Sequence, residues 1–306
     1  MKKIIFPVIL IIFLCYILIF PKESVHAAAF GLELWYAKML PTLLPFAILS
    51  YILIHSGILD SFVRRLHRVI RHIFPVSSAG IYPLAAGLLF GFPMGSKITA
   101  ELVNSGKMTY KEGSRLYCVC NNISPMFVGS YILNDCLKRP DLSAVTYFIL
   151  YVPPLILYAL VNHRECFPAE NEKTSKKPTS INFQIIDAGI MNGFETLTKL
   201  GGYIMLFAIL GQITTRIPVK DIRLSCLIIG FTEITNGIAF TAQNIGDFKL
   251  AYPLMMAYTA FGGLSGLAQT ASMVKDTGFS LMSYLLTRII CSAITFLLAL
   301  LLVWYI

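Results

Sequence analysis

Apolar runs of about 17–25 residues recur along most of this chain, and no other feature limits its fold so strongly. A run of that length is what a helix needs to cross the hydrocarbon core of a bilayer. Charged residues make up 13% of the 306 residues, whereas a soluble globular chain has about 25%. The sequence therefore predicts an all-α integral membrane protein with about seven or eight transmembrane helices.

The first apolar run, residues 4–20, follows Met1 and two lysines. This pattern resembles a secretory signal peptide with a cleavage site near 25–27. Because the run is long for the apolar part of a signal peptide, we expect an uncleaved first helix that acts as a signal anchor. Residues 1–38 would then comprise this helix and an interfacial segment that carries Trp35.

Four short stretches rich in glycine or polar residues interrupt the apolar runs. They are GFPMGSK at 91–97, CNNISPMF at 120–127, GFTEITNG at 230–237 and FGGLSGLAQ at 261–269. Non-helical backbone at membrane depth survives only when it is buried in protein or lines a wet cavity. One break alone is compatible with a simple kink, whereas four together predict re-entrant, broken helices around a binding site.

The most polar stretch of the chain, 163–182, predicts a flexible cytoplasmic linker. It separates two halves, 39–162 and 183–306, and each half contains two of the breaks at a similar spacing. Within the second half we expect an interfacial helix at 183–199 followed by a span at 200–217. Coincidence among the 21 glycines is the alternative explanation of the repeated spacing.

The net charge of +9 is concentrated in basic clusters, in the loop 60–75 and in the linker 163–182. Such clusters beside apolar runs set orientation through the positive-inside rule, and nothing here indicates a nucleic-acid partner. With both basic regions on the cytoplasmic side, the two halves enter the membrane from opposite faces. The sequence thus predicts an inverted repeat, as in many secondary transporters, which bind substrate near the membrane midplane.

Lys97 is the first ionisable residue of interest, at the end of the GFPMGSK break. A helix N-terminus there would present free N–H groups with a partial positive charge, and Lys97 adds a full one. A charged side chain at the bilayer centre costs about 3 kcal/mol on insertion scales. We therefore expect an anionic ligand or a paired carboxylate beside it. The alternative is a position just past the membrane, from which the ammonium group reaches water.

Glu233 is the second such residue, flanked by the oxygen-bearing side chains of Thr235 and Asn236. We expect it to bind a coupling proton or sodium ion, to contact substrate, or to neutralise Lys97; a purely structural hydrogen-bonding role is the alternative. The complete set of expected substrate-binding residues is Gly91, Pro93, Gly95, Ser96, Lys97, Asn121, Asn122, Ser124, Glu233, Thr235, Asn236 and Gln269.

Sequence motifs of enzymes are missing from the chain. It contains no HExxH, GxSxG or Walker A motif, and its five histidines do not pair with a cysteine cluster. The seven cysteines lack the spacing of a disulfide framework or a zinc site. We expect a protein that is not an enzyme and that holds no metal ion or other cofactor.

Three of the breaks together resemble a known family. GFPMGSKITAEL, CNNISPMF and GFTEITNG are similar to motifs of the sporulation integral membrane proteins of the YlbJ type, in the nucleoside-recognition (Gate) domain superfamily. The matching residues are Gly91, Phe92, Pro93, Gly95, Lys97, Cys120, Asn121, Asn122, Gly230, Glu233, Thr235 and Gly237. The resemblance covers residues 39–290. It implies a stage V sporulation role in dipicolinic acid transport and a fold like that of the concentrative nucleoside transporters.

These expectations combine into one hypothesis, a secondary transporter that moves a small organic anion, dipicolinic acid in the first place, across a bacterial cell membrane or the outer forespore membrane. Dipicolinate is a flat dianion, which suits a helix N-terminus with Lys97 for its carboxylates and the amides of Asn121 and Asn122. A nucleoside or other metabolite transporter and a non-transporting scaffold for spore-envelope assembly are the alternatives. Besides the lipid bilayer and the substrate, expected partners are a coupling ion, further copies of the chain, or other sporulation membrane proteins.

Overall fold

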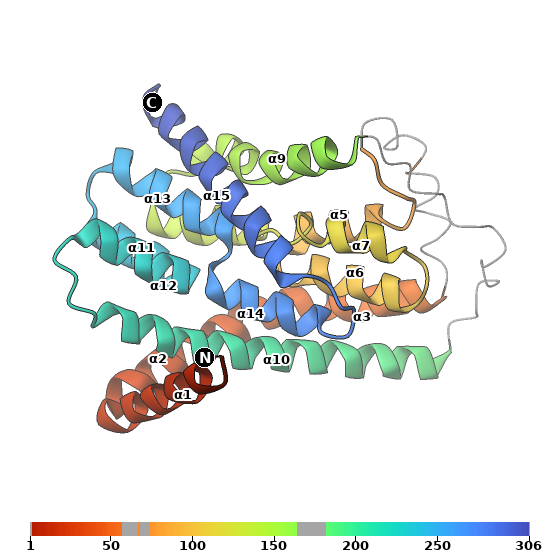
Figure 1. Cartoon of the computed structure of the whole chain (residues 1–306), viewed down its shortest axis with the longest axis horizontal. Helices are drawn as coiled ribbons and strands as arrows, with labels where there is room; N and C mark the ends of the chain where they lie inside the picture. The colour runs from red at the N-terminus through yellow and green to blue at the C-terminus, as the bar shows by residue number, and fades with distance from the viewer. Residues whose placement is uncertain (1, 57–66, 68–73, 164–181, 306) are drawn as a thin grey trace.

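The computed structural model describes residues 2–56, 67, 74–163 and 182–305. In this part the chain is helical, with turns and irregular segments between the helices and without any β-strand (Figure 1). The all-α fold predicted from the apolar runs is confirmed. The basic loop 60–75 and the linker 163–182 fall largely outside the described residues, so the domain boundaries drawn from them stay predictions.

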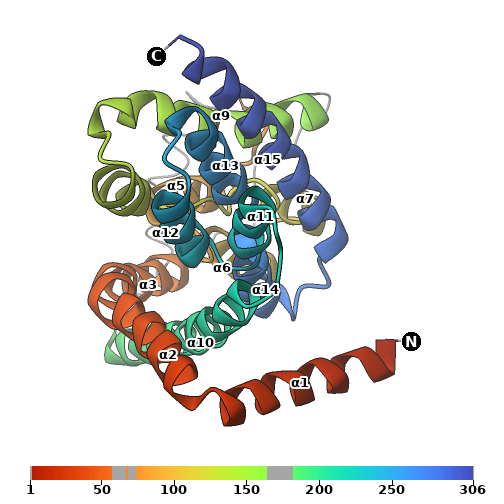
Figure 2. The same cartoon turned by 90° about the vertical axis from the view of Figure 1, so that its left-hand side faces the viewer.

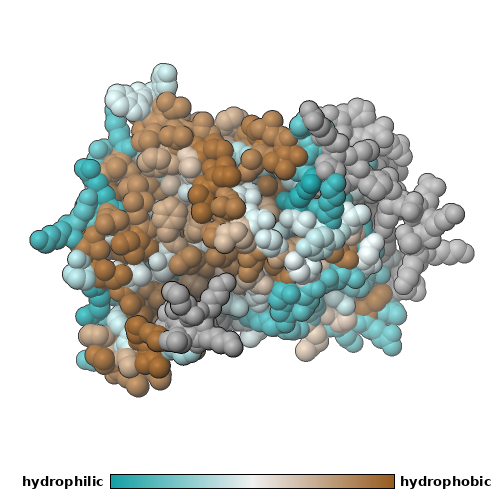
Figure 3. Space-filling view, in the orientation of Figure 1, coloured by the Kyte–Doolittle hydropathy of each residue, from teal (hydrophilic) through white to brown (hydrophobic). Residues whose placement is uncertain are grey.

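Three helices in the described part are long and apolar enough to cross a membrane. They are α9 (Ser143–Asn162), α10 (Phe183–Thr215) and α15 (Leu281–Val303). Large apolar side chains such as Leu297 and Leu301 on α15 are exposed. Figure 3 shows a broad hydrophobic surface over the middle of the molecule, with hydrophilic residues at its left-hand end. Contact with lipid explains such a surface, and the predicted integral membrane location is confirmed.

The N-terminal helices meet the rest of the molecule at an angle. α1 (Lys2–Ile19) and α2 (Pro21–Leu34) are bent by 108° at their junction, and α1 extends away from the other helices (Figure 2). If this bent pair counts as one span, the described part has up to four candidate spans. The total of about seven or eight spans stays a prediction, because shorter apolar helices also lie in the molecule.

α3 (Leu40–Ser56) follows a π-helical turn at Trp35–Met39 and packs, together with α2, against α10. Trp35, which we expected in an interfacial segment, donates from its Nε1 atom to the Leu197 carbonyl at 2.7 Å. The π-helical turn is therefore anchored to α10 rather than only to the membrane surface.

α10 differs from its prediction. The sequence suggested an interfacial helix at 183–199 and a separate span at 200–217, whereas α10 is one helix of 33 residues. The helix continues through the glycine pair at its centre. There Gly201 leaves room for the Trp35 ring. A Cβ atom on Gly201 would lie 2.8 Å from Cε2 of that ring. A glycine close to the expected boundary between 199 and 200 thus serves close packing.

Two pairs of short helices fold back on themselves. α5 (Ile81–Phe90) packs on α6 (Met94–Asn104), and α11 (Ile222–Thr232) packs on α12 (Ile234–Asn244). Each helix has 10 or 11 residues, a rise of about 15 Å, which is half the thickness of the hydrocarbon core. Both pairs therefore have the dimensions of re-entrant hairpins.

Two further helices are interrupted without folding back. α13 (Phe248–Phe261) and α14 (Gly263–Val274) are separated by Gly262, whose backbone is left-handed with φ 95°. The counterpart in the first half consists of α7 (Tyr110–Leu116), α8 (Pro125–Phe127) and a π-helical segment (Val128–Cys136). The order of a first helix (α3 or α10), hairpin, interrupted helix and span thus occurs in each half, while the opposite orientation of the halves stays a prediction.

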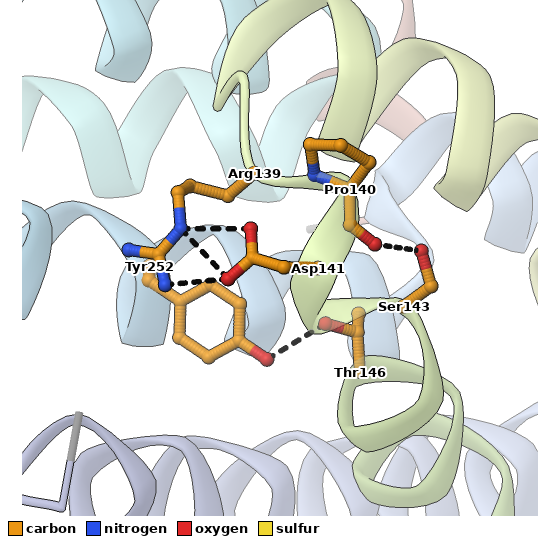
Figure 4. Close-up of polar contacts among 6 residues, drawn as sticks. All are labelled: Arg139, Pro140, Asp141, Ser143, Thr146 and Tyr252. Carbon is orange, nitrogen blue, oxygen red and sulfur yellow. Dashed lines mark hydrogen bonds and ion pairs between the residues drawn. The ribbon is translucent and has the colours of Figure 1, made fainter.

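A short 3-10 helix, Pro140–Leu142, leads into α9 (Figure 4). Before it, Arg139 donates from Nε to Oδ1 of Asp141 at 2.9 Å and from Nη2 to Oδ2 at 2.7 Å. Deeper in the molecule, the hydroxyl groups of Thr146 and Tyr252 are hydrogen-bonded at 2.9 Å. This buried contact ties α9 to α13.

Two apolar cores meet at the CNNISPMF break. One includes Cys120 and the other includes Ile123. Between them in sequence lie Asn121 and Asn122, which are 0% and 3% exposed. Because buried amides require hydrogen-bond partners, this junction is where polar groups must converge.

Candidate functional site

The GFPMGSK and CNNISPMF breaks interlock through their backbones. Gly87 and Gly95 lie against the carbonyl oxygen of Cys120, and Cβ atoms on them would approach it to 1.5 Å and 2.2 Å. The amide of Phe92 donates to the carbonyl of Asn122 at 2.6 Å. Only glycine permits this approach of hairpin α5–α6 to the second break.

The other two breaks join this contact. Gly263, with φ 67°, lies against the carbonyl of Thr232, which a Cβ atom would approach to 3.4 Å. Gly266 lies beside the ring of Phe92, with 3.5 Å from its Cβ position to Cε2. The structure therefore brings the four breaks together, although substrate binding there stays a prediction.

Arg288 on α15 reaches into this junction and was not among the expected site residues. Its side chain donates from Nη1 to Oδ1 of Asn122 at 3.1 Å and from Nε to the carbonyl of Phe261 at 3.3 Å. The residue is 2% exposed. No carboxylate within the described ranges forms a salt bridge with it, so its buried charge is met there by neutral acceptors.

Asn121 lies next to this cation and has one unused acceptor. Its Nδ2 donates to Oγ1 of Thr270 at 2.5 Å and to the hydroxyl of Tyr284 at 3.0 Å. Its Oδ1 is buried and accepts no hydrogen bond from the residues that the structure describes. An unsatisfied buried acceptor costs about 1–3 kcal/mol, so a donor from a ligand or water would stabilise this position.

Lys97 is buried, with 6% of its surface exposed, and does not reach water as the alternative interpretation required. Its Nζ donates to Oδ1 of Asn192 on α10 at 2.6 Å and lies 3.6 Å from Oε1 of Glu101. The paired carboxylate that we expected is therefore Glu101, one helical turn further along α6, and not Glu233.

Glu233 caps α12. Its Oε1 accepts from the amide of Thr235 at 3.1 Å and its Oε2 accepts from the amide of Asn236 at 2.8 Å. The side chain of Asn236 is directed toward α10, where Nδ2 donates to the Ala208 carbonyl at 3.5 Å. Hydrogen bonding of this kind satisfies free N–H groups at a helix N-terminus and matches the structural alternative for Glu233.

The remaining expected residues have mixed surroundings. Ser124 caps α8, because its Oγ accepts from the Phe127 amide at 3.3 Å. Ser96 is fully buried, and its Oγ has no hydrogen-bond partner in the described part of the chain. Pro93 is the N-cap residue of α6, and Gln269 is buried on α14. Bonds from Lys97 run to α10 while those from Asn121 run to α14 and α15, so these two groups do not share partners.

A cavity of about 330 Å³ adjoins the first two breaks. Phe92 and Ser124 line it beside the first two breaks, and Tyr131 and Asp135 line it from the π-helical segment. Its walls are otherwise mainly apolar. Ser124 is an expected binding residue that faces this space.

A single sequence signal would have found Arg288. It lies within the apolar run 280–306, whose length and composition indicate only a span. An arginine inside an apolar run is rare because of its insertion cost, and it marks a function or a buried partner. The apolar residues on both sides of Arg288 keep the run apolar on average, so the run as a whole does not draw attention to the arginine.

The fold and these contacts define an all-α integral membrane protein with interrupted helices around a buried cation. The chain is similar to the sporulation integral membrane protein YlbJ of Bacillus subtilis (strain 168), with 23% identity over 309 residues that cover 88% of this chain and 75% of that protein. The resemblance to YlbJ-type membrane proteins predicted from the three motifs is confirmed. No protein-family model matches the chain, and no solved structure matches it.

Proposed function

We propose that this protein is a secondary transporter that moves a small organic anion, dipicolinic acid in the first place, across a membrane during sporulation. The observation that carries the proposal is Arg288, a buried guanidinium with neutral partners where four helix breaks meet. Keeping a charge in such a place is costly unless a counter-charge joins it. A carboxylate is the natural counter-charge, because guanidinium binds it with two parallel hydrogen bonds.

Dipicolinate fits the chemistry of this position. It is planar and carries two carboxylates, and its ring suits the apolar surroundings of the breaks. The similarity to a sporulation protein supports the biological setting, and the outer forespore membrane is the location that this setting favours. Asn121, next to Arg288, would contact the ligand through its free Oδ1 by way of a bound water.

Lys97 does not serve as the main anion contact. Glu101 and Asn192 already compensate its charge, so it stabilises the first hairpin and adds positive potential to the site. A coupling proton or sodium ion at Glu233 would have to compete with the two amides that this carboxylate caps.

Uptake of labelled dipicolinate into proteoliposomes that contain the purified protein tests the proposal. We expect saturable uptake that unlabelled nucleosides do not block and that Arg288→Gln abolishes. Uptake blocked by nucleosides would favour a nucleoside carrier. If folded protein shows no uptake, and if variants Lys97→Gln and Arg288→Gln still support sporulation, the scaffold function is the better account.

A further inference from the structure

A second cavity, of about 380 Å³, lies between α7, α9 and α15. Figure 1 shows α7 and the C-terminal end of α9 at the right-hand end of the molecule. The polar part of its lining, called the polar wall below, includes Arg115, Ser283 and Thr287, and the apolar part includes Leu157 and Ile290. A planar anion with an apolar ring matches such a mixed lining.

Arg115 is held in place on the polar wall. It donates from Nη1 to Oδ1 of Asn162 at 2.7 Å, and Nδ2 of Asn162 donates in turn to the Tyr158 carbonyl at 2.8 Å. All three residues line the cavity. A guanidinium that is fixed in this way is already oriented for an incoming carboxylate.

Val119, the residue before the CNNISPMF break, lines this cavity and is called its floor below. Its carbonyl accepts from Nδ2 of Asn122 at 2.8 Å. The Oδ1 atom of the same amide accepts from Arg288 at 3.1 Å. On the far side, Ile123 and Ser124 line the 330 Å³ cavity. A few residues at one break thus separate two cavities, and the hydrogen bonds of Asn121 and Asn122 join them to α15.

We propose that the cavity between α7, α9 and α15 is a vestibule for planar carboxylate anions, in which Arg115 is the first contact, and that the hydrogen bond between Asn122 and Arg288 closes its floor. This inference rests on the proposed transport of an organic anion. A carboxylate is a stronger acceptor for guanidinium than a neutral amide. An anion that reaches the floor therefore replaces Oδ1 of Asn122 on Arg288 and loosens the break from α15, to which Asn121 stays bonded through Tyr284.

The vestibule is tested with charged thiol reagents on the full-length protein, in a variant Ser283→Cys. The measured quantity is the rate at position 283 with anionic sulfonatoethyl methanethiosulfonate divided by the rate with its cationic trimethylammonioethyl analogue. We expect this ratio to be at least about threefold higher with Arg115 than in the same protein with Arg115→Gln added. Arg115→Lys should keep the preference. Mass spectrometry of the peptide that contains position 283 separates it from the native cysteines, and the ratio of the two reagents cancels differences in thiol reactivity.

A matched control is Ser130→Cys. Ser130 is also an exposed serine, but it lines the other cavity, beside Asp135. There Arg115→Gln should leave the ratio unchanged. The vestibule proposal is wrong if the ratio of anionic to cationic labelling at position 283 is the same with and without Arg115. It is also wrong if Arg115→Gln changes this ratio equally at positions 283 and 130.

Closure of the floor is tested separately by the rate at which native Cys120 is labelled. Cys120 follows Val119 and is 0% exposed. Asn122→Ala removes the bond to Arg288 and should raise the rate of labelling by the anionic reagent at least about threefold, whereas Asn122→Asp forms an ion pair with Arg288 and should not. An unchanged rate in folded Asn122→Ala, or an equal rise in both variants, contradicts the closure.

Dipicolinate then separates this inference from the proposed substrate. It should protect the thiol of Ser283→Cys from the anionic reagent, while the neutral pyridine-2,6-dicarboxamide should not. Lack of protection, together with a charge preference that depends on Arg115, would reject dipicolinate as the anion and keep the vestibule.

Discussion

Lys97 and Arg288 are two buried cations near the same junction, and the difference between them lies in their partners. Lys97 has a carboxylate within the same helix and an amide oxygen from α10. Arg288 is bonded to an amide oxygen and a backbone carbonyl and to no carboxylate that the structure describes. A compensated cation contributes to the fold, whereas an uncompensated one is kept at a cost that a ligand can offset. Burial alone, which both residues share, does not separate these two roles.

The largest effect is expected at Arg288. Arg288→Gln should lower the initial rate of dipicolinate uptake at least about 100-fold, because two charge-assisted hydrogen bonds of about 1.5 kcal/mol each are lost. Its thermal unfolding in detergent should change little, since glutamine can still donate to Asn122. Near-normal uptake by this variant would remove the distinction between the two cations.

Lys97→Gln should act mainly on stability. It leaves Glu101, whose side chain is 19% exposed, without its cation, and we expect a loss of about 1–2 kcal/mol, less than for a fully buried pair. The double variant Lys97→Gln, Glu101→Gln should recover more than half of this loss. If uptake per folded molecule stays low in the double variant, Lys97 contacts the anion as the sequence first suggested.

Glu233 gives a smaller effect. Glu233→Ala should lower stability by about 1 kcal/mol through loss of the helix cap, and Glu233→Gln by less than half of that. Uptake driven by a pH gradient should persist in Glu233→Gln. Uptake that no longer responds to the gradient would instead assign a coupling proton to this carboxylate.

The smallest effect is expected at the exposed pair of Arg139 and Asp141 before α9. Arg139→Gln should leave both the unfolding temperature and the uptake rate unchanged, because exposed ion pairs contribute little. A clear fall in either measurement would show that charge at the protein surface matters as much as charge at the junction.

The sequence allowed the helix breaks to be located, because Gly91, Glu233 and Gly262 lie in stretches that apolar helices do not contain. It also pointed to Lys97. It could not show that Glu101 neutralises Lys97, since the (i, i+4) spacing becomes a contact only once 94–104 is known to be helical. Similarly, the sequence suggested a helix boundary between 199 and 200 and could not show the packing at Gly201, because the Trp35 ring that fills its space comes from a distant segment.

The hydrogen-bond partners of Arg288 could not be predicted from the sequence either, because they are also distant in the chain. Asn122 and Phe261 lie far from it in the chain, and only the packing of α15 against both interrupted helices brings them together. Hydrophobic periodicity predicts which faces are buried, but it does not predict which buried cation lacks a counter-ion.

Gly87 and Gly95 have a mechanical consequence. With the Cys120 carbonyl seated in the space that their missing side chains leave, hairpin α5–α6 and the following break cannot slide past one another. They must travel as a single rigid body. Any rearrangement that opens one cavity and shuts the other has to occur at another interface of this body. At its interface with α15, such a rearrangement would have to break the hydrogen bonds from Asn121 to Tyr284 and from Arg288 to Asn122.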